Sequence, residues 1–273
     1  MPRVARARRV YRPAPGSLAR MEQTLESPPA ERRPRRRPPR RTWREGGSST
    51  ARWTLELLGW ALLSLGAGVL LANAAALLLP AAIAAPVAQA AIWLGFAVPI
   101  VLAFRRSRPR GLLRFRALDL MYGLVFGVAL RLADGALQGM GGTPAPWPTT
   151  FSIDGSLPDG FALEAALGSI VAPTLEEFFF RGVVLVAAYS VFRRMSGRIA
   201  GGVAAAAVST GLFVIAHLLV EGMDATGVLA LVLLGVVASA LVLGTGRIWA
   251  GVVTHIVFNA TGFLLVAVGT MLS

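Results

Sequence analysis

Seven long apolar runs, separated by short polar or basic segments, fill the chain from residue 53 almost to its end. They lie at about 53–79, 86–104, 118–132, 161–192, 199–220, 227–243 and 249–272. A helix of about 20 apolar residues is long enough to cross the hydrocarbon core of a bilayer. The pattern therefore predicts an all-α, polytopic helical membrane protein with about seven transmembrane helices.

Residues 1–50 have no such pattern and combine arginine with proline. They carry a net charge of +10 out of +13 for the whole chain. Such a segment buries too little apolar surface to offset its ordering entropy. We therefore predict a disordered, Arg/Pro-rich cytoplasmic tail over 1–50, in which Met21 is an alternative start, and a transmembrane domain over 51–273. The first apolar run is long enough to remain as a span, so the tail is not predicted to be a signal peptide.

The charges of the loops alternate along the chain. The tail, residues 105–116, residues 193–198 and Arg247 are basic, whereas the segments between the other spans have no basic residue. Basic loops stay on the cytoplasmic side, so we expect a cytoplasmic N-terminus. Arginines of the tail are expected to attract anionic lipids. The tail lacks the fold and the regular aromatic interleaving of a nucleic-acid-binding surface, so nucleic acid is not an expected partner.

The most unusual segment of the chain is Glu176-Glu177-Phe178-Phe179-Phe180-Arg181, which lies inside an apolar run. A charge at bilayer depth costs about 2.5–3.5 kcal/mol, and residues that bear this cost are usually functional. Glu177 and Arg181 have the favourable i, i+4 spacing of a helical ion pair. Glu176 points about 100° away and remains the free carboxylate, a candidate general base. Pro173 predicts a kink just before it.

The chain has two histidines, and both lie inside predicted spans. His217 shares a helix face with Ser209 and Phe213, because the three residues recur every four positions. His255 and Asn259 also project side by side, and two neighbouring donors are what an oxyanion requires. The alternative is an interhelical hydrogen bond, worth about 0.6–2 kcal/mol.

Straight helices would hold the two histidines at different depths, about 10–15 Å apart. A shared site therefore requires helix tilt, a break at Pro173 or a dipping loop over 221–226. There is no cysteine, which excludes a thiolate nucleophile and a Cys-ligated zinc.

These motifs, taken together and in this order, resemble the CPBP family of CAAX proteases and bacteriocin-processing enzymes, also described as abortive-infection or Ras-converting-enzyme-like membrane proteases. The motifs are Glu-Glu-x-x-x-Arg at 176–181, Phe-x-x-x-His at 213–217 and His-x-x-x-Asn at 255–259. The resemblance covers about 161–263 and leaves out the tail and the first three spans.

The resemblance implies an intramembrane endopeptidase of glutamate type in a bacterial-type plasma membrane. Glu176 with His217 would activate water, and His255 with Asn259 would hold the oxyanion. Glu177 is counted with this catalytic set, and Arg181, Phe213 and Ser209 would support it. The expected partner is a membrane peptide or protein substrate.

Three alternatives remain. The first is a zinc-dependent version of the same protease, with Glu176, His217 and His255 as ligands. The ligand types fit zinc, but the helix lacks the His-Glu-x-x-His spacing, so no cofactor is the preferred expectation. The second is an ion-coupled transporter, although no second copy of the charged segment is present. The third is a non-catalytic membrane scaffold.

Overall fold

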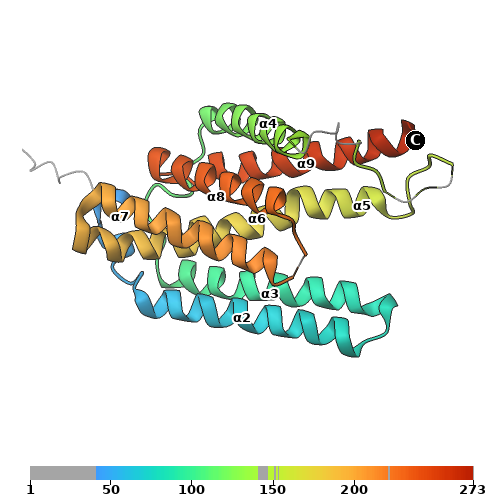
Figure 1. The fold of residues 1–273 in the computed structure, drawn as a ribbon. Helices are drawn as coiled ribbons and strands as arrows, with labels where there is room; N and C mark the ends of the chain where they lie inside the picture. Colours follow the sequence, from blue (N-terminus) through green and yellow to red (C-terminus); the bar gives the residue numbers. More distant parts are fainter. Residues whose placement is uncertain (1–40, 141–146, 151, 153, 221, 273) are drawn as a thin grey trace, which may run out of the picture. The chain divides into compact units, whose positions relative to one another are not determined.

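The computed structural model describes residues 41–140, 147–150, 152, 154–220 and 222–272. All regular elements in this part of the chain are helices, and six of them are long and apolar enough to cross a membrane. The prediction of an all-α membrane protein is therefore confirmed. Figure 1 shows these helices along the chain, from blue near residue 41 to red at the C-terminus.

The six long helical stretches are α2 (Leu55–Leu78), α3 (Ala81–Arg106), α4 (Ala117–Gly139), the continuous stretch Phe161–Leu218, α8 (Ala225–Thr245) and α9 (Trp249–Leu272). The stretch Phe161–Leu218 has 58 residues and contains two of the seven predicted spans. It doubles back at Gly197, which has a φ of 81°, a conformation that glycine adopts without strain. After the turn, Gly201 lies against the backbone of Arg193. Six candidate spans replace the seven predicted ones because two of the predicted spans form one continuous helical hairpin.

Small residues bring the first two helices together. A Cβ atom on Gly68 of α2 would lie only 2.9 Å from the carbonyl oxygen of Ala91 in α3. Ser64 donates a hydrogen bond to the carbonyl oxygen of Gly95, also on α3, at 3.0 Å. In membrane helices, glycine and serine at such positions allow close backbone approach and interhelical hydrogen bonds. The pair α2–α3 forms the blue-to-cyan hairpin of Figure 1.

Helix α4 packs in the same way along α9, although α4 precedes it by more than a hundred residues. Gly123 and Gly127 face Val253 and Val257, with a separation that leaves no room for a Cβ atom. This Gly-x-x-x-Gly spacing is the usual small-residue contact of membrane helices. A large part of the α9 surface is therefore covered by a helix from the first half of the chain.

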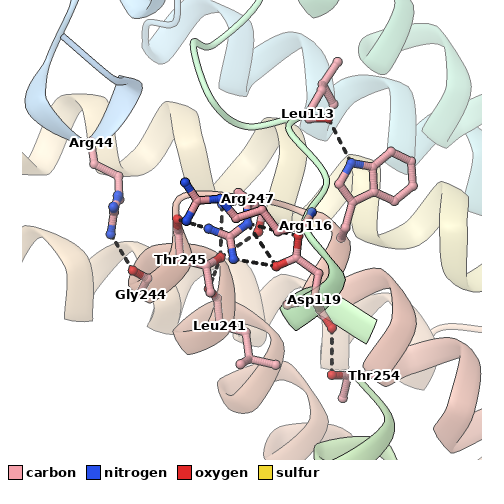
Figure 2. A network of polar contacts seen from close by, with 11 residues as sticks. Arg44, Leu113, Arg116, Asp119, Leu241, Gly244, Thr245, Arg247 and Thr254 are labelled. Carbon is pink, nitrogen blue, oxygen red and sulfur yellow. Dashed lines mark hydrogen bonds and ion pairs between the residues drawn. The ribbon is translucent and has the colours of Figure 1, made fainter. Parts of the chain in front are cut away.

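Two charged contacts complete the α4–α9 interface. Asp119 is fully buried and accepts hydrogen bonds from Nε and Nη2 of Arg247, just before α9, at 2.9 and 2.7 Å (Figure 2). These bonds raise the pKa of the Arg247 guanidinium above its ordinary value. Further along, Arg131 donates to the carbonyl oxygen of Phe258 at 2.7 Å. The start and the middle of α9 are each fixed to α4.

The segment before α2 corrects one prediction. It holds two short 3₁₀ helices, η1 (Trp43–Glu45) and η2 (Ser48–Thr50), where we expected the end of a disordered tail. Trp43 is only 1% exposed, and its Nε1 donates to the carbonyl oxygen of Gly246 at 2.9 Å. Arg44 donates to the carbonyl oxygen of Leu243 in the last turn of α8, and the C-terminal end of a helix favours a cation. Figure 2 shows the neighbouring hydrogen bond, from Arg44 to Gly244. Residues 1–40 lie outside the described residues.

The contacts of η1 predict where the chain can be shortened. Removal of 1–50 deletes the buried Trp43, whereas removal of 1–40 retains it. Loss of a buried tryptophan side chain costs about 3–5 kcal/mol. Removal of 1–50 and the substitution Trp43→Ala should therefore each lower the thermal midpoint in detergent by several degrees. Trp60→Ala, at a half-exposed position of α2, is the matched control. Equal midpoints for the two truncated chains would contradict this assignment.

Candidate active site

The acidic pair lies in a stretch where the helix changes its winding twice. From Phe161 the chain forms α5 (Phe161–Ala166), a π-helical turn η3 (Leu167–Val171), α6 (Ala172–Glu177), a second π-helical turn η4 (Phe178–Val184) and α7 (Leu185–Leu218). Such π turns within α-helices are rare and are frequent at functional sites. Both carboxylates thus belong to a short α-helical segment between two wide turns.

The first wide turn explains the hydrogen bond of Asn259. In a π-helix the carbonyl of residue i accepts from the N–H of residue i+5. For Gly168 this residue is Pro173, which has no N–H. The amide Nδ2 of Asn259 donates to the Gly168 carbonyl oxygen at 3.0 Å instead. The proline predicted to disturb the helix therefore leaves a carbonyl that α9 satisfies.

Glu177 is the centre of a buried charged cluster. Its Oε1 accepts from Nη1 of Arg181 at 2.8 Å, and both side chains are fully buried. The same oxygen lies 3.0 Å from Nδ1 of His255. The ion pair predicted from the i, i+4 spacing is present, and it includes a histidine from a distant helix.

Glu176 faces a different space, as its position on the helix predicts. Its Oε2 lies 3.8 Å from Nε2 of His217 and also 3.8 Å from Nε2 of His255. The side chains of Glu176 and His217 are 14% and 19% exposed, whereas that of His255 is 3% exposed. The two histidines therefore meet at one carboxylate despite the difference in depth expected for straight helices. Because 3.8 Å is too long for a direct hydrogen bond, Glu176 is not bonded directly to either ring, and a water molecule beside them can contact the carboxylate and an imidazole together.

The hydrogen bonds of the histidines indicate which nitrogen carries a proton. Nδ1 of His217 lies 2.9 Å from the carbonyl oxygen of Phe213, which can only accept. Nδ1 of His255 faces the carboxylate of Glu177 in the same way. Each Nδ1 is therefore the donor, and Nε2 of a neutral ring is free to accept a proton. With Nδ1 as the donor to Glu177, His255 has an Nε2–H to donate only when both ring nitrogens carry a proton.

Phe213 forms the wall behind these groups. Its ring centroid lies 4.5 Å from that of His217 and 5.7 Å from that of His255. The guanidinium carbon of Arg181 lies 4.5 Å from the same centroid, in cation–π geometry. Ser209, one turn earlier on this face, donates to the carbonyl oxygen of Phe180 at 2.9 Å. The predicted face of Ser209, Phe213 and His217 does point toward the acidic segment.

Two residues near the site were missed by the sequence analysis. Gly168 accepts the hydrogen bond of Asn259, and Gly251 leaves space for Glu177, since a Cβ atom there would lie 3.1 Å from Oε2. Gly251 stands four residues before His255, so it lies on the same helix face. Gly168 has the signal of standing five residues before a proline. The Gly168–Pro173 spacing indicates a role only once the π turn is known, and the Gly251–His255 spacing only once the neighbouring helix is known.

Among the residues considered as zinc ligands, His217 and His255 lie near one carboxylate oxygen of the third, Glu176. Among the described residues, however, no group of three His, Cys, Asp or Glu side chains is placed so that it could hold a metal ion. One nitrogen of each histidine is also engaged by another acceptor. Zinc-bound histidines usually have such a second hydrogen bond, so this engagement does not argue against a metal.

Comparison with known proteins identifies the segment that carries this site. Residues 158–261 match the model of the Rce1-like type II CAAX prenyl endopeptidase family. This segment belongs to that family. Membership implies an intramembrane protease, and the members are peptide hydrolases. No curated protein and no solved structure matches the chain significantly. The Rce1-like segment includes all three motifs, while α4, which packs on α9, lies before it.

The buried pair generates a prediction about stability. Arg181→Met leaves the carboxylate of Glu177 without its guanidinium and should destabilise the fold by about 3–5 kcal/mol. The double variant Glu177→Gln/Arg181→Met should recover most of this loss, because a neutral amide oxygen still accepts from His255. Thermal midpoints in detergent measure both effects.

Arg106→Met is the matched control, because it breaks a more exposed pair with Glu56. It should change stability by about 1 kcal/mol or less. A double variant as unstable as Arg181→Met alone would show that the charge of Glu177 is not the cause.

Proposed function

We propose that this chain is an intramembrane endopeptidase that cleaves a membrane-embedded or membrane-associated peptide with water activated by Glu176 and His217. The observation that supports the proposal most directly is the position of Glu176. Its carboxylate is partly exposed and lies 3.8 Å from both imidazoles, so one water molecule can contact the carboxylate and His217 together. A carboxylate and an imidazole on one water are suited to general-base catalysis.

In this mechanism the oxygen of the water attacks the carbonyl carbon of the scissile peptide bond. The proton released passes to Glu176 or to Nε2 of His217, and the carbonyl oxygen becomes an oxyanion. His255, as an imidazolium, and the second hydrogen on Nδ2 of Asn259 donate to that oxyanion. The C–N bond then breaks, and the stored proton passes to the leaving amine. The products are a carboxylic acid and an amine.

Glu177 and Arg181 have a positioning role in this proposal. The carboxylate of Glu177 holds His255 through Nδ1 and so fixes the orientation of the ring whose Nε2 faces the oxyanion. Arg181 balances the charge of Glu177 and stacks on Phe213. The metal-free mechanism is the one proposed, and zinc dependence is an outcome of the test below.

We also propose that the basic end of the bundle faces the cytoplasm and contacts anionic lipids. Three arginines from separate segments lie near η1. The carbonyl oxygen of Arg110 accepts from the backbone N–H of Trp43, and Arg193 donates to the carbonyl oxygen of Arg44. Arg247 follows Gly246, whose carbonyl oxygen accepts from Trp43. Basic residues of one sign at one end of a helical membrane protein are typical of its cytoplasmic side. The N-terminal tail would add to this charge.

The first test is cleavage of a library of membrane peptides, with and without a prenylated cysteine, by purified protein in detergent. Glu176→Gln should abolish cleavage while leaving the thermal midpoint unchanged, because glutamine keeps the size of the side chain but cannot act as a base. Glu164→Gln, at an exposed glutamate of the same helical stretch, is the control and should cleave as the unchanged protein does.

A strong chelator distinguishes the remaining possibilities. Cleavage that does not respond to the chelator supports the water-activating glutamate. Cleavage lost with the chelator and restored by zinc would overturn the metal-free mechanism. If neither folded protein cleaves any peptide, the scaffold or the transporter becomes the better hypothesis; a transporter would then show ion flux that Glu176→Gln uncouples.

The two roles of Asn259 can be separated with Pro173. Asn259→Ala should lower kcat by about 10²–10³-fold, as expected for loss of an oxyanion donor, and should lower the thermal midpoint because Gly168 loses its donor. Adding Pro173→Ala supplies a backbone N–H five residues after Gly168. The double variant should recover the thermal midpoint but not kcat. Recovery of both would show that Asn259 only holds the helix.

A further inference from the structure

An open pocket of about 540 Å³ lies at the end of α3, where this span meets the basic segment that follows it. Its lining residues are Val101, Phe104, Arg105, Ser107 and Arg108. The volume is within the range of about 300–1,000 Å³ that small-molecule sites have. The pocket belongs to the first half of the chain and lies outside the Rce1-like segment.

The charges of this pocket are unbalanced. Arg105 and Arg108 are exposed, and neither has an ion-pair partner among the described residues. Nη2 of Arg106, which stands between them in the chain, lies 3.1 Å from Oε1 of Glu56 on α2. The carboxylate of Glu56 is therefore neutralised by another guanidinium, and the pocket keeps two positive charges.

The walls of the pocket are held from behind. The ring of Phe104 packs edge-on against Trp53, with centroids 5.7 Å apart. Nε1 of Trp53 donates to Oγ of Ser107 at 3.0 Å, and that hydroxyl donates to the carbonyl oxygen of Ser49 at 2.8 Å. Because its one hydrogen is used, Ser107 cannot also donate to a ligand. The donors that remain for a ligand are the two guanidinium groups, on a wall that is already ordered.

An apolar stripe on α3 leads to this pocket. Leu94, Val98, Val101 and Arg105 stand four, three and four residues apart, so they share one face of the helix. The three apolar side chains are 63%, 47% and 47% exposed, although they lie in a candidate membrane span. Exposed apolar side chains of a span face the acyl chains of the bilayer. The order along this face, apolar side chains and then a cation, matches the order of acyl chain and phosphate in an anionic lipid.

We propose that the pocket binds the phosphate headgroup of one anionic membrane lipid, with an acyl chain along Leu94, Val98 and Val101. A guanidinium binds a phosphate through two parallel N–H···O bonds, which suits Arg105 and Arg108. Basic pockets between membrane helices are typical sites for such headgroups. The proposal names a discrete site, beyond the general attraction of the basic end for anionic lipids. It depends neither on the N-terminal tail nor on peptide cleavage.

Other occupants fit this pocket less well. The carbonyl groups at the C-terminal end of α3 repel an anion, so binding depends on the arginine side chains and not on the helix itself. The N-terminal tail is itself strongly basic, so the charge of the pocket repels it. An acidic, water-soluble peptide would match the two arginines but not the apolar stripe. A lipid matches both.

The test measures lipid binding to purified, delipidated full-length protein in detergent by native mass spectrometry. The probe is dioleoyl phosphatidylglycerol, and dioleoyl phosphatidylcholine is its zwitterionic comparison. Arg105→Gln/Arg108→Gln should weaken the binding of one phosphatidylglycerol molecule by about 30-fold, which is about fivefold for each arginine. Equal binding of the two lipids by the unchanged protein would contradict the proposal.

Arg114→Gln/Arg116→Gln is the matched control. These two arginines are exposed in the same basic segment but do not line the pocket, so the control removes the same charge. It should retain the bound phosphatidylglycerol, and equal losses in the two double variants would replace the discrete site with a general effect of charge. Glu176→Gln should bind the lipid as the unchanged protein does, so loss of cleavage and loss of lipid binding are distinguishable.

Two further measurements separate a lipid from other ligands and do not require the arginine variants to fold. Inorganic phosphate and glycerol 3-phosphate, which lack acyl chains, should not displace phosphatidylglycerol at equal concentration. Phosphatidylglycerol with a photoreactive acyl chain should label α3 near Val98 and Val101. Displacement by free phosphate, or labelling confined to other helices, would overturn the proposal. Tighter binding of an acidic peptide at the same arginines would overturn it in favour of a protein partner.

Discussion

The carboxylate of Glu177 is the contact on which the rest of the site depends. One of its oxygens accepts from Arg181 on the following turn and from His255 on α9, and all three side chains are buried. Removing one member of such a group leaves a charge in a medium that cannot solvate it, which costs far more than an exposed ion pair contributes. The cluster thus fixes α9 against the acidic helix in one register. The distance from Glu176 to His255 follows from that register, whereas His217 reaches Glu176 from α7.

Two adjacent glutamates can have different functions because a helix separates them by about 100°. Glu177 points into the bundle and is engaged by two donors, whereas Glu176 points to a partly exposed space between two imidazoles. The buried carboxylate supports structure, and the other remains available for chemistry. This arrangement places the carboxylate that we propose to be catalytic next to its own support, without a second acidic motif elsewhere in the chain.

The sequence predicts those features that depend on local spacing. Apolar runs indicate the spans, and the i, i+4 rule indicates the Glu177–Arg181 pair and the shared faces of the histidine motifs. The convergence of His217 and His255 on Glu176 could not be predicted, because it depends on how distant helices cross. Trp43 was missed because it stands in an arginine-rich segment, and its burial depends on the linker at Gly246. The contact between α4 and α9 joins residues more than a hundred positions apart and leaves only a Gly-x-x-x-Gly spacing as its signal.

The two π turns have a consequence for the length of the chain. A wide turn holds more residues than an α-helical turn, so deletion of one residue within 167–171 could restore regular winding without breaking the helix. Such a deletion would leave the flanking segments nearly in phase, because a π turn with its extra residue rotates the chain about as far as the α turn that replaces it. A deletion within α6 would instead rotate the preceding segment relative to Glu176 by about 100° and carry Gly168 away from Asn259. The number of residues between Gly168 and Glu176 is therefore constrained as well as their identity. A change that keeps every charged and polar side chain could still dismantle the site by altering only the count.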